Sequence, residues 1–174
     1  MRPVFPHRRN PRLRDYDYSS EGLYFVTICT HLRQPLFGEI IAGIMHLNQA
    51  GKAVEQTCDR MFRSSEDAAT WIVMPNHLHA IVAIIDADDP SATSSRKPLG
   101  RLIAGFKASS KRRVNEIRRT PHIEVWQRNF YEHIIGSERA LKRIEAYIRD
   151  NPMRWEEDPE NHAPPEHRHD HPNG

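Results

Sequence analysis

The segment ATWIVMPNHLHAIVAIID, Ala69 to Asp86, decides the fold that this sequence predicts. Its β-branched and apolar residues are typical of strands, and Pro75-Asn76 interrupts them. We expect either two strands separated by a short break or one strand that continues through a kink. A short break favours antiparallel pairing, because a parallel crossover needs a connection of a dozen or more residues.

The remaining elements surround this segment. Residues 23–30, LYFVTICT, predict a strand, and residues 36–48 predict two short strands with a bend near Gly43. Asn48 and Ser137 are expected to cap helices, the second of which ends before Pro152. The predicted helices cover 50–62, 99–119 and 138–151, and a short strand or extended segment lies within 125–135.

The order of these elements predicts an α+β fold. Helices that lie between strands must cover a face of the sheet. We therefore expect a ferredoxin-like antiparallel sheet with helices packed on it.

Charge is distributed unevenly along the 174 residues, although 25 Lys and Arg against 23 Asp and Glu give a net charge of only +2. The start is rich in arginine, residues 101–119 hold seven basic residues against one acid, and residues 156–174 hold six acids against one arginine. We predict a basic N-terminal arm over 1–20, a folded domain over 21–157 and an acidic, His-rich disordered tail over 158–174. The separation of charge indicates a polyanionic partner.

Two classes of protein are disfavoured by composition. No apolar run approaches the roughly 20 residues that a membrane span needs, so we expect no membrane contact. Cys29 and Cys58 fit neither a disulfide framework nor the CxxC spacing of a metal site. The expected location is the cytoplasm.

His77 and His79 form the sharpest local feature. Side chains alternate along a strand, so both imidazoles project from one face while Leu78 points to the other. The pair can converge on one divalent ion. For an H-x-H motif alone, two ordinary histidines at a strand end are the commoner outcome.

Tyr147 and Asn151 form a second pair, spaced one helical turn apart. Asn151 precedes Pro152, which biases its backbone out of the helix and leaves its amide free to turn toward a ligand. Tyr147 lies at the edge of an apolar stripe, so it either extends that stripe or faces a site.

These four residues suggest one reaction. A divalent metal held by His77, His79 and Asn151 withdraws charge from a phosphodiester. These ligands do not select the ion by themselves, and we expect Mg²⁺ or Mn²⁺. The phenolate of Tyr147 attacks phosphorus and forms a covalent phosphotyrosine. A free tyrosine has a pKa near 10, so its deprotonation needs the field of the metal or a bound hydroxide.

Basic residues in three regions predict contacts with a nucleic-acid backbone that weaken as salt rises, although those of 101–119 equally fit a solvated helix face. Trp126, Phe130 and Tyr131 either stack on unpaired bases or belong to the core. The predicted DNA contacts are Arg8, Arg9, Arg12, Arg14, Lys107, Lys111, Arg112, Arg113 and Arg128.

The motif VMPNHLHAIV, Val73 to Val82, resembles the HUH block of the single-tyrosine transposases of small bacterial insertion sequences. Three flanking segments resemble the REP-associated tyrosine transposase branch of that family, so the resemblance covers about residues 12–157. They are DYDYSSEGLYFVTICTHLRQPLFGEI, LGRLIAGFKASS and VWQRNFYEHIIGSERALKRIEAYIRDNPMRW.

The resemblance implies metal-dependent cleavage and rejoining of single-stranded DNA, often folded as a hairpin. It implies His77 and His79 as metal ligands, Tyr147 in YIRDNP as the nucleophile and Asn151 as the third ligand. The implied products are a 5′-phosphotyrosine and a free 3′-OH, and the implied assembly is a monomer or a homodimer. Gly136 departs from the family pattern, because a basic residue is expected there.

Two other functions remain open. A domesticated relative would bind hairpin nucleic acid without cutting it, but the retention of the four candidate residues argues against a pure binder. A zinc hydrolase would use His77 and His79 with a third histidine or a carboxylate. No third ligand of that kind is evident, which argues against the hydrolase.

Overall fold

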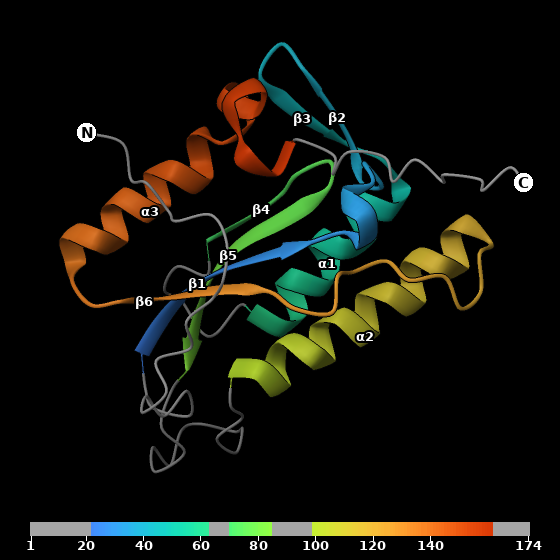
Figure 1. Ribbon diagram of the computed structural model, residues 1–174, viewed down its shortest axis with the longest axis horizontal. Helices are drawn as coiled ribbons and strands as arrows, with labels where there is room; N and C mark the ends of the chain where they lie inside the picture. The colour runs from blue at the N-terminus through green and yellow to red at the C-terminus, as the bar shows by residue number, and fades with distance from the viewer. Residues whose placement is uncertain (1–21, 63–69, 85–98, 162–174) are drawn as a thin grey trace, which may run out of the picture.

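The computed structural model describes residues 22–62, 70–84 and 99–161 (Figure 1). The predicted basic arm and residues 162–174 of the predicted tail lie outside these ranges. The elements are β1 (Gly22–Cys29), η1 (His31–Arg33), β2 (Gly38–Ile41), β3 (Ile44–Leu47), α1 (Gln49–Phe62), β4 (Trp71–Val73), β5 (His77–Ile84), α2 (Leu99–Arg118), β6 (Tyr131–Ile135), α3 (Glu138–Asp150), η2 (Pro152–Glu157) and η3 (Pro159–Asn161).

The main sheet has the strand order β4-β5-β1-β6, and every neighbouring pair is antiparallel. Without the β2–β3 hairpin and α3, the element order is the βαββαβ of ferredoxin-like folds. The predicted α+β, ferredoxin-like fold is therefore confirmed. The bend near Gly43 is the turn of the hairpin, where Ala42 and Gly43 adopt φ values of 50° and 75°.

Residues 71–84 form two strands, β4 and β5, which pair from Trp71 opposite Ala80 to Val73 opposite Leu78. The amide of Met74 donates to the carbonyl of His77 at 2.8 Å and closes the turn around Pro75-Asn76. Proline has no N–H to give to a sheet, which suits it to this turn. The alternative of one continuous kinked strand is wrong.

The two faces of the sheet carry separate layers of helices. Leu78, Ala80 and Val82 face one way and pack with α1 and α2 in the larger core. Phe25 and Ile81 face the other way and pack against α3. Figure 1 shows α3 on one side of the sheet and α1 with α2 on the other. None of the described helices is long and apolar enough to cross a membrane.

The predicted helix caps are confirmed. Asn48 Oδ1 accepts from the amide of Gly51 at 2.9 Å, and Ser137 Oγ accepts from the amide of Ala140 at 3.2 Å. The expected backbone at Asn151 is wrong, because this residue keeps helical angles of φ −58° and ψ −43°. Its carbonyl accepts from the amide of Arg154 at 3.0 Å, so η2 continues the helical path and offsets the bias before proline.

Trp126 belongs to the core. It is 5% exposed, its ring lies 5.1 Å from that of Phe37 and 5.7 Å from that of Phe106, and Nε1 donates to Ser110 Oγ at 2.9 Å. Base stacking by this side chain is therefore excluded in the structure described. Phe130 packs against the same core.

Lys107 on α2 secures the segment that leads into β6. Its Nζ donates to the carbonyls of Gln127, Arg128 and Asn129 at 2.8, 3.2 and 2.9 Å, and lies 5.5 Å from the centre of the Phe130 ring. The ammonium therefore uses its donors inside the protein. This role differs from the phosphate contact that the sequence predicted.

We expect Lys107→Met to lower the free energy of unfolding by about 1–2 kcal/mol, because methionine keeps the packing on Phe130 but cannot donate to the three carbonyls. Urea denaturation monitored by circular dichroism measures the change. Lys52→Met on the exposed side of α1 is the matched control and should stay within about 0.5 kcal/mol of the parent. Equal stability of the two variants would show that the bonds of Lys107 contribute nothing.

Candidate functional site

His77 and His79 lie side by side on the face of β5 that α3 covers. They are 0% and 2% exposed, and their ring centres are 4.4 Å apart. The alternation of side chains along the strand therefore places both imidazoles together, as the sequence indicated.

The hydrogen bonds of Asn76 fix the tautomer of His77. Asn76 Nδ2 donates to the carbonyl of Glu160 at 2.7 Å and to that of Arg33 at 3.3 Å, so its Oδ1 is the acceptor for His77 Nδ1 at 2.9 Å. The proton of His77 then resides on Nδ1. The lone pair of Nε2 is left without a hydrogen-bond partner, which is the arrangement of a metal-binding histidine.

His79 connects the sheet to α3. Its Nδ1 lies 2.9 Å from Thr27 Oγ1 on β1, and its Nε2 lies 3.4 Å from the Tyr147 hydroxyl. Burial lowers the pKa of His79 to about 3. Burial, with the neighbouring His79 and Arg33, also lowers the pKa of His77 well below its ordinary value. Both rings are therefore neutral at pH 7, as metal ligation requires.

Asp158 brings a carboxylate to the two histidines. It is 3% exposed, Oδ1 accepts from the amide of Glu160 at 2.7 Å, and Oδ2 lies 3.9 Å from His77 Nε2. One ligand atom each from His77, His79 and Asp158 lie within 4.8 Å of one another. The sequence placed Asp158 at the start of a disordered tail, whereas the structure places it in the folded part of the chain.

Asn151 lies beside this cluster and is 2% exposed. Among the described residues, three buried side-chain atoms lack a hydrogen-bond partner, and all three belong to this site. Such atoms are costly unless something satisfies them. A divalent cation that accepts their lone pairs fits this arrangement. The atoms are His77 Nε2, Asn151 Oδ1 and Asp158 Oδ2.

Tyr147 has both of the roles that the sequence left open, because it extends the apolar stripe of α3 and also faces the site. Its ring packs edge-on against Phe25, with centres 6.1 Å apart, and its hydroxyl points to His79. Burial raises the pKa of Tyr147, as do the carboxylates of Asp158 and Glu160, while the Asn151 amide lowers it. Without a cation, the phenol is therefore protonated at neutral pH.

The segment Pro152–Asn161, here called the cover, closes over the histidines. Trp155 stacks on His77 with ring centres 6.0 Å apart and planes at 27°. Glu160 forms an ion pair with Arg33 and accepts from the Cys29 thiol at 3.1 Å. These contacts tie the cover to the end of β1 and to η1, so the cluster is shielded from solvent.

Sequence reasoning missed three residues of this site: Thr27, Asn76 and Asp158. Thr27 gave no signal, because only the register of β1 with β5 places it opposite His79. Asn76 is adjacent to His77 in the chain, and that adjacency was the available clue. Asp158 lies in an acidic, proline-rich stretch whose composition is typical of a tail.

The predicted DNA contacts of α2 lie across the sheet from Tyr147, because α2 packs on the opposite face. Lys111 pairs with Glu124 at 2.5 Å, Arg112 lies 3.9 Å from Glu116, and Arg113 donates to Gln56 at 2.8 Å. Arg128 is exposed. The structure thus does not bring these cations to the nucleotide that Tyr147 would contact. Arg8, Arg9, Arg12 and Arg14 lie outside the described residues.

Fold and site together define a ferredoxin-like protein with a buried His–His–Asp cluster facing a tyrosine. Known proteins with similar sequences add to this description. The sequence is 38% identical to an "Uncharacterized protein" of Haemophilus influenzae over 87% of this chain and 92% of that protein, so the two belong to one family. It is 22% identical, over 79% of this chain and 74% of the other, to a "Putative REP-associated tyrosine transposase" of the same organism. This similarity agrees with the resemblance to REP-associated tyrosine transposases that the motifs indicated.

Two solved structures are also similar. One is a REP-associated tyrosine transposase bound to a REP hairpin, with a TM-score of 0.46 and 21% identity over 76% of this chain and 67% of that one. The other is a "putative transposase" of Deinococcus radiodurans, with a TM-score of 0.44 and 16% identity over 79% of this chain and 94% of that one. No family model matches the chain.

Asp158→Asn should have opposite effects on the metal-free and the metal-loaded protein. Burial raises the pKa of Asp158, so the unfolded chain ionises this carboxyl more readily than the folded protein does. The carboxylate therefore begins to cost stability as the pH rises above its unfolded pKa, and the cost is complete once the pH exceeds the raised folded pKa. In EDTA at pH 7, we expect the variant to unfold at a higher temperature than the parent.

With Mn²⁺ present, the same variant should lose about tenfold or more in metal affinity, because an amide replaces the negatively charged carboxylate ligand. Thermal unfolding at a series of Mn²⁺ concentrations measures both effects. Glu156→Gln, an exposed carboxylate of the cover, is the matched control and should change neither. Undiminished Mn²⁺ stabilisation of Asp158→Asn would remove Asp158 from the ligand set.

Proposed function

We propose that this protein is a metal-dependent transposase that cleaves and rejoins single-stranded, hairpin-forming DNA through a covalent link to Tyr147. The observation that carries the proposal is the position of the Tyr147 hydroxyl, 3.4 Å from His79 and next to three buried atoms without partners. A tyrosine whose only role was packing would not need its hydroxyl at such a cluster.

His77, His79, Asp158 and Asn151 would hold the ion. Two neutral imidazoles, a carboxylate and an amide oxygen suit a divalent cation, and we propose Mn²⁺ or Mg²⁺. When bound, the ion supplies positive charge that polarises a phosphodiester and favours the phenolate of Tyr147. Asn76 and Thr27 would keep both histidine rings oriented toward the centre.

The cleavage step makes one bond and breaks one. The Tyr147 hydroxyl loses its proton, its oxygen bonds to phosphorus, and the bond from phosphorus to the 3′ oxygen breaks. The 3′ oxygen takes up a proton and leaves as a free 3′-OH, while the 5′ phosphate stays on Tyr147. The reverse attack by a 3′-OH rejoins the strand without a nucleotide cofactor.

The partner that we propose is single-stranded or hairpin DNA, bound by a monomer or a homodimer in the cytoplasm. The relationship to REP-associated tyrosine transposases supports this partner. The backbone contacts of the N-terminal arginines, Lys111, Arg112, Arg113 and Arg128 stay predictions. Because the cover shields the cluster, a phosphodiester can reach the ion only after the cover shifts.

Hydrolysis by an activated water is a second candidate function, and Asp158 favours it. The sequence argument against a hydrolase rested on the lack of a third ligand, and the structure supplies a carboxylate at that place. A pure nucleic-acid binder stays the alternative without chemistry. The two catalytic candidates differ in whether Tyr147 becomes linked to DNA.

Tyr147→Phe should abolish the covalent adduct between the protein and a hairpin oligonucleotide in Mn²⁺, because the attacking oxygen is gone. The phenyl ring keeps its packing on Phe25, so DNA affinity should remain largely unchanged. A denaturing gel measures the adduct, and fluorescence anisotropy measures the affinity. Cleavage by this variant at the parent rate would favour the hydrolase and reject Tyr147 as nucleophile.

His77→Ala should eliminate adduct formation even at saturating DNA, as EDTA should for the parent protein, because the lone pair of Nε2 is lost. The same denaturing gel, run across a Mn²⁺ titration, measures this effect. His46→Ala removes an exposed histidine of β3 and should retain parent activity. Full activity of His77→Ala would mean that the metal is bound elsewhere or is not needed.

A further inference from the structure

Two arginines on α3 form a row that leads to Tyr147. Arg139, Arg143 and Tyr147 are spaced four residues apart, so they follow one another along one side of the helix. Each step of four residues rises about 6 Å along the axis. Ile144 and Ile148 face the sheet, which leaves the row at the border between the buried and exposed sides.

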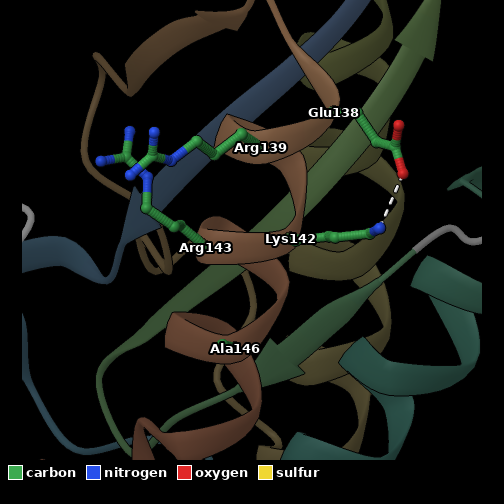
Figure 2. Close-up of a pocket in the computed structure, with 5 residues that line it drawn as sticks. All are labelled: Glu138, Arg139, Lys142, Arg143 and Ala146. Atoms are coloured by element: carbon green, nitrogen blue, oxygen red, sulfur yellow. Dashed lines mark ion pairs between the residues drawn. The ribbon is translucent and has the colours of Figure 1, made fainter.

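Figure 2 shows how the charges are arranged on this helix. The side chains of Arg139 and Arg143 both extend to the same side of the helix in this view. Lys142 extends to the other side, where its Nζ lies 2.7 Å from a Glu138 carboxylate oxygen. These residues and Ala146 line a shallow pocket of about 450 Å³.

The two arginines carry charge that no described residue neutralises. Within residues 22–62, 70–84 and 99–161, no carboxylate forms an ion pair with Arg139 or Arg143. Like charges four residues apart on a helix repel each other, so an anion between the two guanidinium groups would stabilise them. Guanidinium groups match the oxygens of phosphate in a two-pronged geometry.

We propose that Arg139 and Arg143 bind the sugar–phosphate backbone of single-stranded DNA and guide it along α3 to Tyr147. This inference rests on the function proposed above, since it assigns the path by which the substrate reaches the hydroxyl. The steps between the three side chains suit successive phosphates of an extended strand. The cations of α2 cannot serve this purpose, because the sheet separates them from Tyr147.

The salt dependence of DNA binding tests the proposal separately from the chemistry. Each phosphate contact to a single strand contributes about 0.7 to the slope of log K against log salt. In a Tyr147→Phe background, Arg139→Ala with Arg143→Ala should reduce the magnitude of that slope by about 1.4 for a short oligodeoxythymidylate. Arg139→Lys with Arg143→Lys should retain most of it.

Lys52→Ala with Arg60→Ala is the matched control. It removes the same charge from exposed positions of α1, and its slope should equal that of the background protein. Equal slopes for the two double alanine variants would overturn the proposal, as would failure of the background protein to bind the oligonucleotide.

The adduct assay separates this inference from the proposed function. With Tyr147 present, the Arg139→Ala, Arg143→Ala variant should need more DNA for half-maximal adduct and still reach the parent rate at saturation. A protein that binds DNA with the predicted slopes but forms no adduct would support the arginine path and reject the proposed chemistry.

Discussion

The alternation of side chains along β5 is the constraint on which the rest of the structure depends. Leu78, Ala80 and Val82 must face α1 and α2, because the larger core closes only around apolar groups. The intervening residues, among them His77 and His79, are thereby turned toward α3. A slip of one residue would exchange the two sets, so the packing of one face fixes the histidines on the other.

Burial determines the chemical properties of this site and also lowers the stability of the fold. It keeps the two imidazoles neutral, raises the pKa of Asp158 and Tyr147, and leaves three polar atoms without partners. A protein selected for stability alone would replace such a cluster with apolar groups. Buried polar atoms without partners are expected at functional sites. The apolar cores on both sides of the sheet offset their cost in stability.

Local patterns in the sequence were sufficient for the α-helices and strands and for four residues of the site, His77, His79, Tyr147 and Asn151. The β-branched runs gave the strands, Asn48 and Ser137 gave the helix starts, and the spacing within each pair gave the shared face of the histidines and of Tyr147 with Asn151. The place of Asp158 depends on contacts with segments far away in the chain, which no local pattern encodes. The positive charges of α2 could also be predicted. The sequence did not indicate that Lys107 donates its hydrogen bonds to the carbonyls of residues 127–129.

The cover also sets the order in which the site matures as the chain is made. His77 and His79 leave the ribosome before Asp158 does, and β6 is synthesised between them. A chain that ended after α3 would contain every strand of the sheet, both histidines and Tyr147, but would lack Asp158 and the cover. Synthesis of residues 152–161 then adds the carboxylate and the shield in one step, so ligand completion and closure happen together.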